Sequence, residues 1–327
     1  IQREFTMMLV TGATGFVGRE LVSKLLTKDC QIKALVRKTS GLPVEVEQVV
    51  VDLCEIEGQV AINAAFTGLD VVVHAAARVH MIQDQSANPL AEFRKLNRAV
   101  TLALAALAAD KGVKRFVFLS SIGVNGNNSV KPFSEKDTPN PQEPYAISKY
   151  EAEQALLVLA RKTGMQVVII RPPLVYGPNA PGNFGTLVNW LRRGVPLPLG
   201  AINNKRSFVA LDNLVSFIAL CGDRSQSPKA ANQVFLISDG EDVSTTQLLR
   251  KVADALGKEP YLLPVPVGLM IFAARLIGKG DVANRLFGSL QVDSSKARDL
   301  LGWQPVITMD EQLNKTVAAD LKNEKTL

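Results

Sequence analysis

A glycine-rich turn between a strand pattern and a helix pattern constrains the fold of this chain more than any other feature. Residues 7–10 form a short apolar run that predicts a β-strand, and residues 15–26 predict a helix with apolar side chains along one side. Between them, TGATGFVG places Gly12, Gly15 and Gly18 in a G-x-x-G-x-x-G spacing. A strand, a glycine turn and a helix in this order predict the first unit of a dinucleotide-binding βαβ fold.

Each glycine of this turn has a predicted task. Gly12 permits the tight turn, Gly15 lets the backbone approach a pyrophosphate, and Gly18 lets the helix pack against the strand. The N-terminus of the helix then directs its free N–H groups and the positive end of its dipole at the phosphates. The other cofactor contacts predicted in this motif are Thr14, Phe16 and Val17.

The rest of the first half alternates short apolar runs with helical patterns. We expect helices at 89–111 and 145–163, and further strands at 32–36, 48–51, 71–74, 115–120 and 167–171. This alternation predicts an α/β protein of the Rossmann type, with a doubly wound parallel sheet. We expect residues 1–171 to form the dinucleotide-binding domain, which also receives later segments of the chain.

The second half has a different texture. Residues 172–206 contain many prolines, glycines and asparagines, which predicts irregular loops that face a ligand. Farther along we expect a strand at 233–237 and helices at 245–256, 268–276 and 294–301. Residues 172–327 are therefore expected to form mostly a smaller, C-terminal substrate-binding lobe that is interwoven with the first domain.

Composition limits the class of protein. Hydrophobic residues make up 47% and charged residues 21%, which is typical of a globular chain. The net charge of +6 indicates either a mildly basic surface or an anionic ligand such as a dinucleotide or a nucleotide diphosphate. Basic runs do not exceed a dipeptide and aromatic residues make up only 6%, so nucleic acid is not expected as a partner.

Cysteine and histidine usage bears on compartment and metals. The three cysteines are far apart and form no C-x-x-C, which predicts a reducing, cytoplasmic location and no structural zinc. With His74 and His80 as the only histidines, a histidine-rich metal site is excluded, and no metal is expected. No signal peptide is visible. The apolar run 265–277 is too short to span a bilayer and is interrupted by Arg275, so we expect a buried or amphipathic helix and no membrane partner.

The end of the second predicted strand bears on the cofactor. A binder of unphosphorylated NAD usually carries Asp or Glu there to hold the ribose hydroxyls, whereas Arg37 suits a 2′-phosphate. The cofactor is therefore predicted to be NAD(P), with NADP(H) favoured by Arg37, unless Arg37 and Lys38 are solvated surface charges. After the third strand, Asp52 either reaches the adenine amino group or forms a strand-end turn. Leu53 beside it is also a predicted cofactor contact.

A tyrosine and a lysine form the predicted catalytic pair. Tyr145 and Lys149 are four residues apart in a predicted helix, which puts both on one face. A tyrosine base must lose its proton far below its ordinary pKa of about 10, and a neighbouring lysine cation favours the phenolate. Lys149 can also hold the ribose of the nicotinamide. Ser120 and Ser121 end the fifth predicted strand, where a hydroxyl can bond a substrate oxygen.

The motifs together resemble a known family. The order of TGATGFVG, HAAA, SSIGVNG, YAISK and RPPLVYGP resembles the extended short-chain dehydrogenase/reductase superfamily, in its nucleotide-sugar epimerase/dehydratase branch. The resemblance covers essentially the whole chain. It implies that Ser121 is the catalytic hydroxyl, Tyr145 the acid/base and Lys149 its partner. It also implies cofactor contacts at Ala75, Ala76, Ala77, Asn97, Pro172 and Val175.

The resemblance also bears on the substrate. It implies that Arg206 grips a substrate diphosphate, as a bidentate guanidinium is suited to do, with Arg285 a further candidate. The 4,6-dehydratases of the branch carry an Asp-Glu pair after the catalytic threonine. Here Ile122 and Gly123 stand there, so dehydration is not expected. Leu174 stands where many sugar epimerases have asparagine, and Asn179 or Asn183 would have to substitute for it.

The implied chemistry is hydride transfer at a sugar C4 through a 4-keto species. A UDP-sugar 4-epimerase is expected first, and the alternative is an NADPH-dependent reductase of a UDP-4-keto-6-deoxy-sugar, which Arg37 favours. A non-nucleotide ketone reductase is a weaker alternative because of Arg206, and a non-catalytic NADP(H) sensor is weaker because the catalytic residues are present. Relatives often pair through the helices at 89–111 and 145–163, so a homodimer is expected.

Overall fold

A parallel sheet forms the centre of the larger lobe. The computed structural model describes residues 6–28, 30–55, 60–78, 88–276, 278 and 280–324, and in this part of the chain the sheet has seven strands in the order β3-β2-β1-β4-β5-β6-β9. The strands are β1 (Met7–Thr11), β2 (Gln31–Val36), β3 (Val46–Val50), β4 (Val71–His74), β5 (Arg115–Leu119), β6 (Gln166–Arg171) and β9 (Gln233–Leu236). The order reverses at β1 and β4, where ligands bind in open α/β sheets. The predicted Rossmann-type fold is confirmed.

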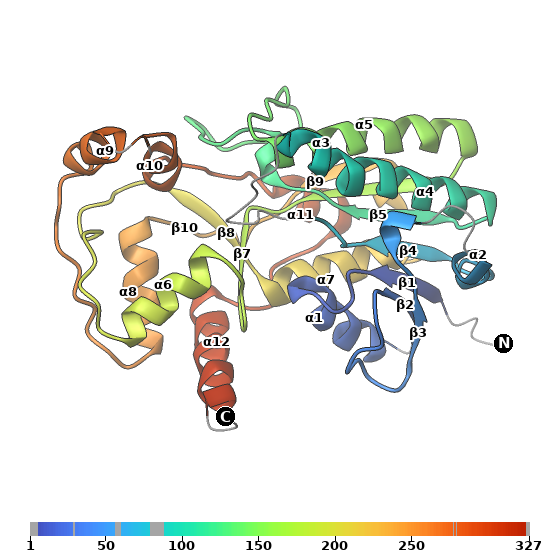
Figure 1. Cartoon of the computed structure of the whole chain (residues 1–327), viewed down its shortest axis with the longest axis horizontal. Helices are drawn as coiled ribbons and strands as arrows, with labels where there is room; N and C mark the ends of the chain where they lie inside the picture. The colour runs from blue at the N-terminus through green and yellow to red at the C-terminus, as the bar shows by residue number, and fades with distance from the viewer. Residues whose placement is uncertain are drawn as a thin grey trace.

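Helices cover both faces of this sheet (Figure 1). One face carries α1 (Phe16–Leu26), α7 (Leu211–Gly222) and α11 (Ser295–Leu301), whose side chains share one hydrophobic core with the strands. The other face carries α2 (Val60–Ala65), α4 (Thr101–Asp110) and α5 (Pro144–Thr163), around a second core. Because both faces are covered, the sheet's strands are apolar almost throughout.

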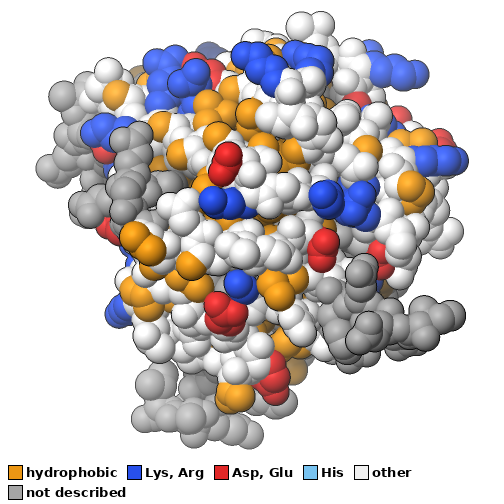
Figure 2. Space-filling view, turned by 90° about the vertical axis from the view of Figure 1, so that its right-hand side faces the viewer, with side chains coloured by type: hydrophobic (Ala, Val, Ile, Leu, Met, Phe, Trp, Pro, Cys, Tyr) orange, Lys and Arg blue, Asp and Glu red, His pale blue; other side chains and the backbone are white. Residues whose placement is uncertain are grey.

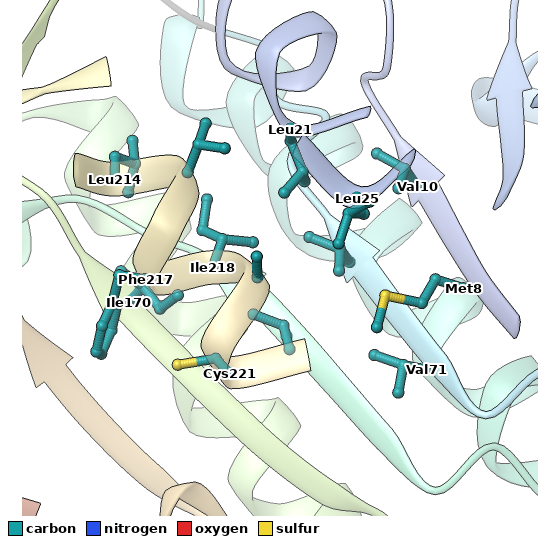
Figure 3. Close-up of a cluster of buried hydrophobic side chains, with 14 of the residues drawn as sticks. Met8, Val10, Leu21, Leu25, Val71, Ile170, Leu214, Phe217, Ile218 and Cys221 are labelled. Carbon is teal, nitrogen blue, oxygen red and sulfur yellow. The ribbon is translucent and has the colours of Figure 1, made fainter. Parts of the chain in front are cut away.

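Helix α7 belongs to the second half of the chain but completes the core of the first. In Figure 3, Leu214, Phe217 and Ile218 of α7 lie over the sheet beside Leu21 and Leu25 of α1. Segments beyond residue 171 are therefore part of the larger lobe.

The smaller lobe has a sheet of its own. Strand β8 (Arg206–Ala210) pairs in parallel with β7 (Leu174–Tyr176) and antiparallel with β10 (Asp242–Val243). Three helices contribute to a separate core around this sheet: α6 (Asn183–Arg192), α8 (Thr245–Ala255) and α12 (Met309–Glu324). Figure 1 shows this lobe at the opposite end of the molecule from β3 and α2.

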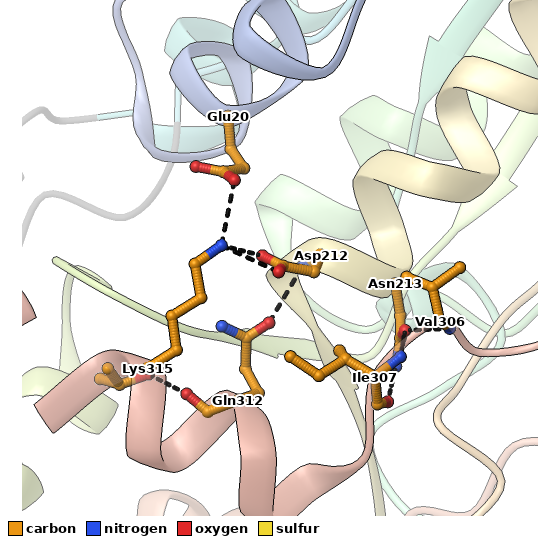
Figure 4. A network of polar contacts seen from close by, with 8 residues as sticks. Glu20, Asp212, Asn213, Val306, Ile307, Gln312 and Lys315 are labelled. Carbon is orange, nitrogen blue, oxygen red and sulfur yellow. Dashed lines mark hydrogen bonds and ion pairs between the residues drawn. The ribbon is translucent and has the colours of Figure 1, made fainter. Parts of the chain in front are cut away.

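The C-terminal helix is bonded to the larger lobe. Lys315 of α12 forms ion pairs with Glu20 of α1 at 3.2 Å and with Asp212 of α7 at 2.8 Å (Figure 4). The side chain of Gln312 accepts a hydrogen bond from the Asp212 amide, and that of Asn213 accepts from the Ile307 amide. These contacts join α12, and with it the smaller lobe, to the helices α1 and α7 of the larger lobe.

Two predictions about regular structure were wrong in part. The stretch 172–206 is not wholly irregular, since it contains β7 and the helix α6. Phe184, Val188 and Leu191 recur at helical spacing and are buried in the smaller core, which outweighs the glycines and prolines around them. The helix expected at 89–111 is interrupted. It consists of α3 (Pro89–Phe93), a π-helical stretch from Arg94 to Val100, and α4.

The apolar run 265–277 was expected to form a buried or amphipathic helix; it is a helix, not a buried one, and Val267 and Met270 pack partly against the smaller core. Its described part is α9 (Val267–Leu276), in which no side chain is buried and Phe272 is 60% exposed. Figure 1 shows α9 beside α10 (Gly280–Phe287) at the far end of the smaller lobe, where no further layer covers it. Over the described ranges, no helix combines the length and apolarity needed to cross a membrane.

The positive charge is dispersed on one visible face. Figure 2 views the end of the molecule that carries β3 and α2, and its Lys and Arg side chains lie in small groups with Asp and Glu between them. On this face the charge of +6 therefore does not gather into a continuous basic band.

Candidate active site

The glycine turn lies directly against the end of β4. Gly12 has a φ of +72°, and a Cβ built on it would lie 2.7 Å from the backbone nitrogen of Ala76. A Cβ on Gly18 would overlap the carbonyl oxygen of Gly12, so α1 can approach the turn only because Gly18 has no side chain. The Gly15 amide donates to the Gly12 carbonyl at 2.9 Å. The turn thus joins three backbone segments that only glycine lets meet.

The start of α1 fits a pyrophosphate. Its N-cap residue is Gly15, no described side chain caps its amides, and its first turn holds no acidic residue. The open N–H groups and the dipole therefore face outward beside exposed Thr14, as an anion site requires. Phe16 and Val17 pack partly against the core below. These residues suit the phosphates of a dinucleotide.

The residues expected at the adenosine end lie along the carboxyl edge of the sheet. Arg37 is exposed and directly follows β2. Asp52 accepts a hydrogen bond from the Cys54 amide at 2.9 Å, as in a strand-end turn, and its contact with the adenine amino group stays a prediction. Leu53 packs partly against the core, and the half-buried residues Ala75, Ala76 and Ala77 follow β4 beside Gly12.

Replacing Gly12 with alanine is expected to weaken NAD binding by about 10- to 100-fold, because strain at positive φ and the overlap with Ala76 together displace the turn. Isothermal titration with NAD measures the change. Gly112→Ala is the matched control, since Gly112 has a φ of +77° but open space around its Cβ position. Equal NAD affinity in the Gly12 variant and the control would show that the contact with Ala76 does not shape the site.

A buried histidine connects the cofactor turn to the helix beneath it. The Ala76 amide donates to Thr11 Oγ1 at 3.2 Å, and Thr11 Oγ1 lies 2.7 Å from His74 Nδ1. His74 Nε2 lies 2.9 Å from Thr101 Oγ1, which itself donates to the Asn97 carbonyl. Because Thr101 Oγ1 donates its proton to the Asn97 carbonyl, it can only accept a hydrogen bond from His74. The ring proton of His74 is therefore on Nε2. Burial, aided by the charge of Lys149, lowers the pKa of His74 to about 3, so the ring stays neutral.

Asn97 carries this connection on to the catalytic helix. Its side chain accepts from the Arg78 amide at 2.8 Å and donates to Ser148 Oγ at 3.1 Å. Ser148 in turn donates to the Tyr145 carbonyl at 2.7 Å. The hydrogen bonds thus run without a break from the glycine turn to the first turn of α5.

Helix α5 supplies both members of the predicted catalytic pair. Pro144 at its first position fixes the start of the helix, so Tyr145 and Lys149 occupy successive turns of one face. The Tyr145 ring packs edge-on against Phe93, with ring centroids 5.9 Å apart. Lys149 is 1% exposed, and its Nζ donates to the Leu119 carbonyl at 2.8 Å.

Burial shifts the pKa values of both groups away from the charged forms. It raises the pKa of Tyr145 to about 12. It lowers the pKa of Lys149 to about 7, against the opposing effect of the Glu153 charge. A phenolate at position 145 therefore needs a nearby cation, and Lys149 is the cation that the helix supplies.

The two serines at the end of β5 point in different directions. Ser120 is buried and donates to Glu153 Oε1 at 2.5 Å. Ser121 is half-buried, and its Oγ accepts from the Gly123 amide at 3.1 Å in a turn packed against Ala146. Of the two, Ser121 is therefore the one not engaged by Glu153, and its turn lies against Ala146 in the first turn of α5.

The segment after β6 lies against the serine turn. The Ile122 amide donates to the carbonyl of Pro172, which is itself buried, at 2.9 Å, and this bond joins the segment to the serine turn. Val175 is half-buried in β7, whereas Leu174 beside it is 39% exposed. The structure thus brings together Ser121, Tyr145, Lys149 and Pro172 at the carboxyl edge of β5 and β6.

The predicted substrate contacts are less well defined. Arg206 begins β8, donates to the Gly288 carbonyl at 3.2 Å, and has a pKa that burial lowers below its usual range. Arg206 therefore lies in the smaller lobe with its guanidinium partly desolvated. Asn183 begins α6 and Arg285 lies in α10, but both side chains are outside the described ones.

Sequence reasoning missed a buried cluster behind the catalytic pair. Glu153, Arg171 and Asn125 are all buried, and Arg171 donates to Asn125 Oδ1 at 2.9 Å and to Glu153 through Nε at 2.9 Å. The available signal was the spacing, because Glu153 follows Lys149 by four residues on the same helical face.

Comparisons with known proteins agree with this geometry. The model of the NAD dependent epimerase/dehydratase family matches residues 8–236. A UDP-glucose 4-epimerase of Vibrio cholerae is 45% identical, over 96% of this chain and 95% of that protein. An N-acetyl-alpha-D-glucosaminyl-diphospho-ditrans,octacis-undecaprenol 4-epimerase of Escherichia coli O157:H7 is 27% identical over 97% of this chain and 96% of that protein. The structure of a UDP-glucose 4-epimerase with UDP-glucose from Thermotoga maritima superimposes with a TM-score of 0.77 at 27% identity, over 98% of this chain and 100% of that chain.

Proposed function

The chain belongs to the NAD-dependent epimerase/dehydratase family, and we propose that it interconverts the C4 epimers of a UDP-linked sugar through a 4-keto species. The observation that carries the proposal is the arrangement of Ser121, Tyr145 and Lys149 at the carboxyl edge of β5, beside a glycine turn that fits a dinucleotide. The similarity to UDP-glucose 4-epimerases supports the choice of substrate class.

The proposed roles follow from the geometry. Tyr145 accepts the proton of the sugar O4 hydroxyl, and Ser121 hydrogen-bonds the same oxygen. NAD held at the glycine turn would supply the acceptor and the donor of the C4 hydride. The positive charge of Lys149 lowers the pKa of Tyr145 and so favours its phenolate, and Lys149 also contacts the nicotinamide ribose. After the keto sugar has turned over in the site, C4 is reduced on its opposite face and Tyr145 returns the proton to O4, which gives the alcohol with inverted configuration at C4.

The two lobes divide the binding work in this proposal. Residues 1–171, with the later segments that join the sheet, bind the cofactor, and Gly12, Gly15 and Gly18 hold its pyrophosphate. Residues 172–327 mostly bind the nucleotide sugar, with Arg206 on the diphosphate and Arg285 and Asn183 as further contacts. Ile122 and Gly123 leave no acid after Ser121 for the elimination of water.

The deciding experiment incubates the protein with NAD and either UDP-GlcNAc or UDP-glucose, without reductant, and follows the C4 epimers by NMR. The proposal expects epimers without net consumption of cofactor. A parallel reaction offers UDP-4-keto-6-deoxy-GlcNAc with NADPH and follows the absorbance at the nicotinamide band. Stoichiometric NADPH oxidation without any epimer formation would replace the epimerase with a reductase.

Arg37 is the observation that favours this second function. It stands exposed after β2, where a binder of unphosphorylated NAD usually has a carboxylate. A reductase that consumes NADPH would use Arg37 to bind the 2′-phosphate, whereas an epimerase recycles its cofactor and usually keeps NAD.

If Arg37 binds the 2′-phosphate, Arg37→Glu is expected to weaken NADPH binding by about 10- to 100-fold, because it removes a charge-assisted hydrogen bond and adds repulsion. NADH affinity is expected to change little. Fluorescence titration with both reduced cofactors measures the ratio, and Lys38→Glu on the neighbouring exposed lysine is the control. An unchanged NADPH affinity would make Arg37 a solvated surface charge and favour NAD.

We further propose a cytoplasmic homodimer. The cysteines Cys30, Cys54 and Cys221 lie far apart in the sequence and form no C-x-x-C, which suits a reducing compartment. Helix α5 and the π-helical stretch present Arg94, Arg98 and Tyr150 around a surface hollow, next to Val158, which is 41% exposed. A four-helix contact between two copies would cover this surface. Sedimentation that finds only monomer at micromolar concentration would exclude the dimer.

A further inference from the structure

The Glu153 carboxylate is fixed in the interior by three donors. Arg171 donates through Nε to Oε1 at 2.9 Å and through Nη2 to Oε2 at 2.5 Å, and Ser120 donates to Oε1 at 2.5 Å. Glu153 is 0% and Arg171 4% exposed. Arg171 is held in addition by Asn125, so neither partner of this ion pair can turn toward solvent. The carboxylate therefore occupies one defined place behind the active site.

That place is one helical turn from the catalytic lysine. Tyr145, Lys149 and Glu153 follow one another at intervals of four residues, which stacks them along one face of α5. The Lys149 Nζ lies 4.5 Å from the centre of the Phe118 ring and donates to the Leu119 carbonyl. The Phe118 ring and the Leu119 carbonyl are both uncharged. The buried Lys149 ammonium therefore has no anion among these contacts on β5.

The other charged groups near Lys149 do not supply one. His74 on β4 stays neutral, with its ring stacked on Phe118 at 5.9 Å. Tyr145 on α5 is protonated in the resting site, and Arg171 on β6 is a cation. Arg94 and Arg98 of the π-helical stretch are partly exposed and paired with Glu151. Among the described groups around Lys149, Glu153 is the anion on its face of the helix.

We propose that Glu153 is a positioning residue whose carboxylate, fixed by Arg171 and Ser120, is the buried counter-charge of the Lys149 ammonium. Burial lowers the pKa of Lys149 to about 7, and the Glu153 charge is what opposes this fall. Without the carboxylate, Lys149 loses its proton at a lower pH and no longer favours the Tyr145 phenolate. The electrostatic effect on Lys149 stands by itself, and its consequence for turnover rests on the proposed function.

The test is a direct titration of Lys149 by NMR in protein with 13C-labelled lysine, with the resonance assigned by its absence in Lys149→Met. Glu153→Gln is expected to move the titration of Lys149 to lower pH by about one unit or more. Glu153→Asp should restore part of the shift. Glu151→Gln, on the same helix but in a surface ion pair, is the matched control and should leave the titration where it is.

A double variant serves as the control for misfolding of Glu153→Gln. Glu153→Gln leaves Arg171 buried without its counter-charge, which destabilises a protein strongly. The double variant Glu153→Gln with Arg171→Gln removes both charges and keeps hydrogen-bonding groups at both positions. It should fold, and Lys149 should still titrate at lower pH than in the parent, because the Glu153 charge that raises its pKa is absent in this variant too.

Activity gives a second readout that separates the two proposals. If the enzyme epimerises a UDP-sugar, the alkaline limb of its kcat profile should move to lower pH in Glu153→Gln, by about the same amount as the Lys149 titration. If no sugar reacts but Lys149 shifts, the proposed function fails and the counter-charge stands. If Lys149 titrates at the same pH in the folded single and double variants as in the parent, the assignment of Glu153 is overturned.

Discussion

Replacing Tyr145 with phenylalanine is expected to lower the kcat of epimerisation by about 100- to 10,000-fold, the range typical for the loss of a general acid/base. Phenylalanine keeps the ring that packs on Phe93 at 5.9 Å, so the helix and the cofactor site should be preserved. NAD affinity is accordingly expected to change little. The measurement is the initial rate of C4 epimer formation by NMR, with the NAD affinity determined on the same preparation.

The size of this effect follows from the lack of a substitute. Burial raises the pKa of Tyr145 to about 12, so in the proposed mechanism the phenolate needs the charge of Lys149 beside it. His74 is not a candidate base, because both of its ring nitrogens are engaged by Thr11 and Thr101. Tyr261→Phe, at a position that is 64% exposed, is the control for loss of a phenol. Turnover in Tyr145→Phe comparable to that of the control would remove Tyr145 from the mechanism.

The parts of the fold that depend on local pattern were predictable from sequence. The glycine turn needs φ values and close approaches that no other residue permits, so its spacing identified the strand, the turn and the helix around it. The parallel strands are buried on both faces and read as short apolar runs. These signals lie within about ten residues of one another and require no knowledge of distant segments.

Elements whose partners come from far along the chain were harder to predict. Helix α6 is stabilised by α8 and β8, so the glycines and prolines around it misled a local interpretation. Helix α9 shows the reverse, because an apolar run is compatible with burial while its side chains pack at most partly against the smaller core. In both cases the neighbouring elements, and not the composition of the segment, determined how far the helix is buried.

The same distinction separates the parts of the candidate site. Tyr145 and Lys149 share a helix, so their spacing alone placed them on one face. Ser120 and Ser121 differ by the alternation of a strand, which sends the first inward to Glu153 and leaves the second toward the site. The spacing from Lys149 indicated only the helical face of Glu153, because its partner Arg171 comes from β6 and meets it only when α5 packs on the sheet.

The buried polar groups form two connections that meet at α5. One runs from Ala76 through His74 and Asn97 to the first turn of the helix, and the other runs from Arg171 to Glu153 in its third turn. The first joins the cofactor turn to Tyr145, and the second faces Lys149. In the proposed mechanism, catalytic geometry therefore depends on these buried groups and on the core that holds the sheet beneath them.

That dependence predicts the largest effect on stability at Phe217. Truncation to alanine is expected to lower the free energy of unfolding by about 3–5 kcal/mol, the range for a buried aromatic side chain. Phe217 is 0% exposed and packs edge-on against Phe235 and Trp303, with ring centroids 5.4 and 5.1 Å away (Figure 3 shows its place under α7). Urea unfolding measures the change, and Phe272→Ala, at a position that is 60% exposed, is the matched control.

The cavity left at position 217 would lie between β9, α7 and α11, segments from beyond residue 171 that complete the sheet of the cofactor lobe. Loosening α7 also loosens Asp212 and its ion pair with Lys315, so the smaller lobe should detach more easily from α1. We therefore expect Phe217→Ala to weaken substrate binding as well as stability, while Phe272→Ala leaves both nearly unchanged. A loss below about 1 kcal/mol, as for a surface site, would mean that this core collapses around the truncated side chain.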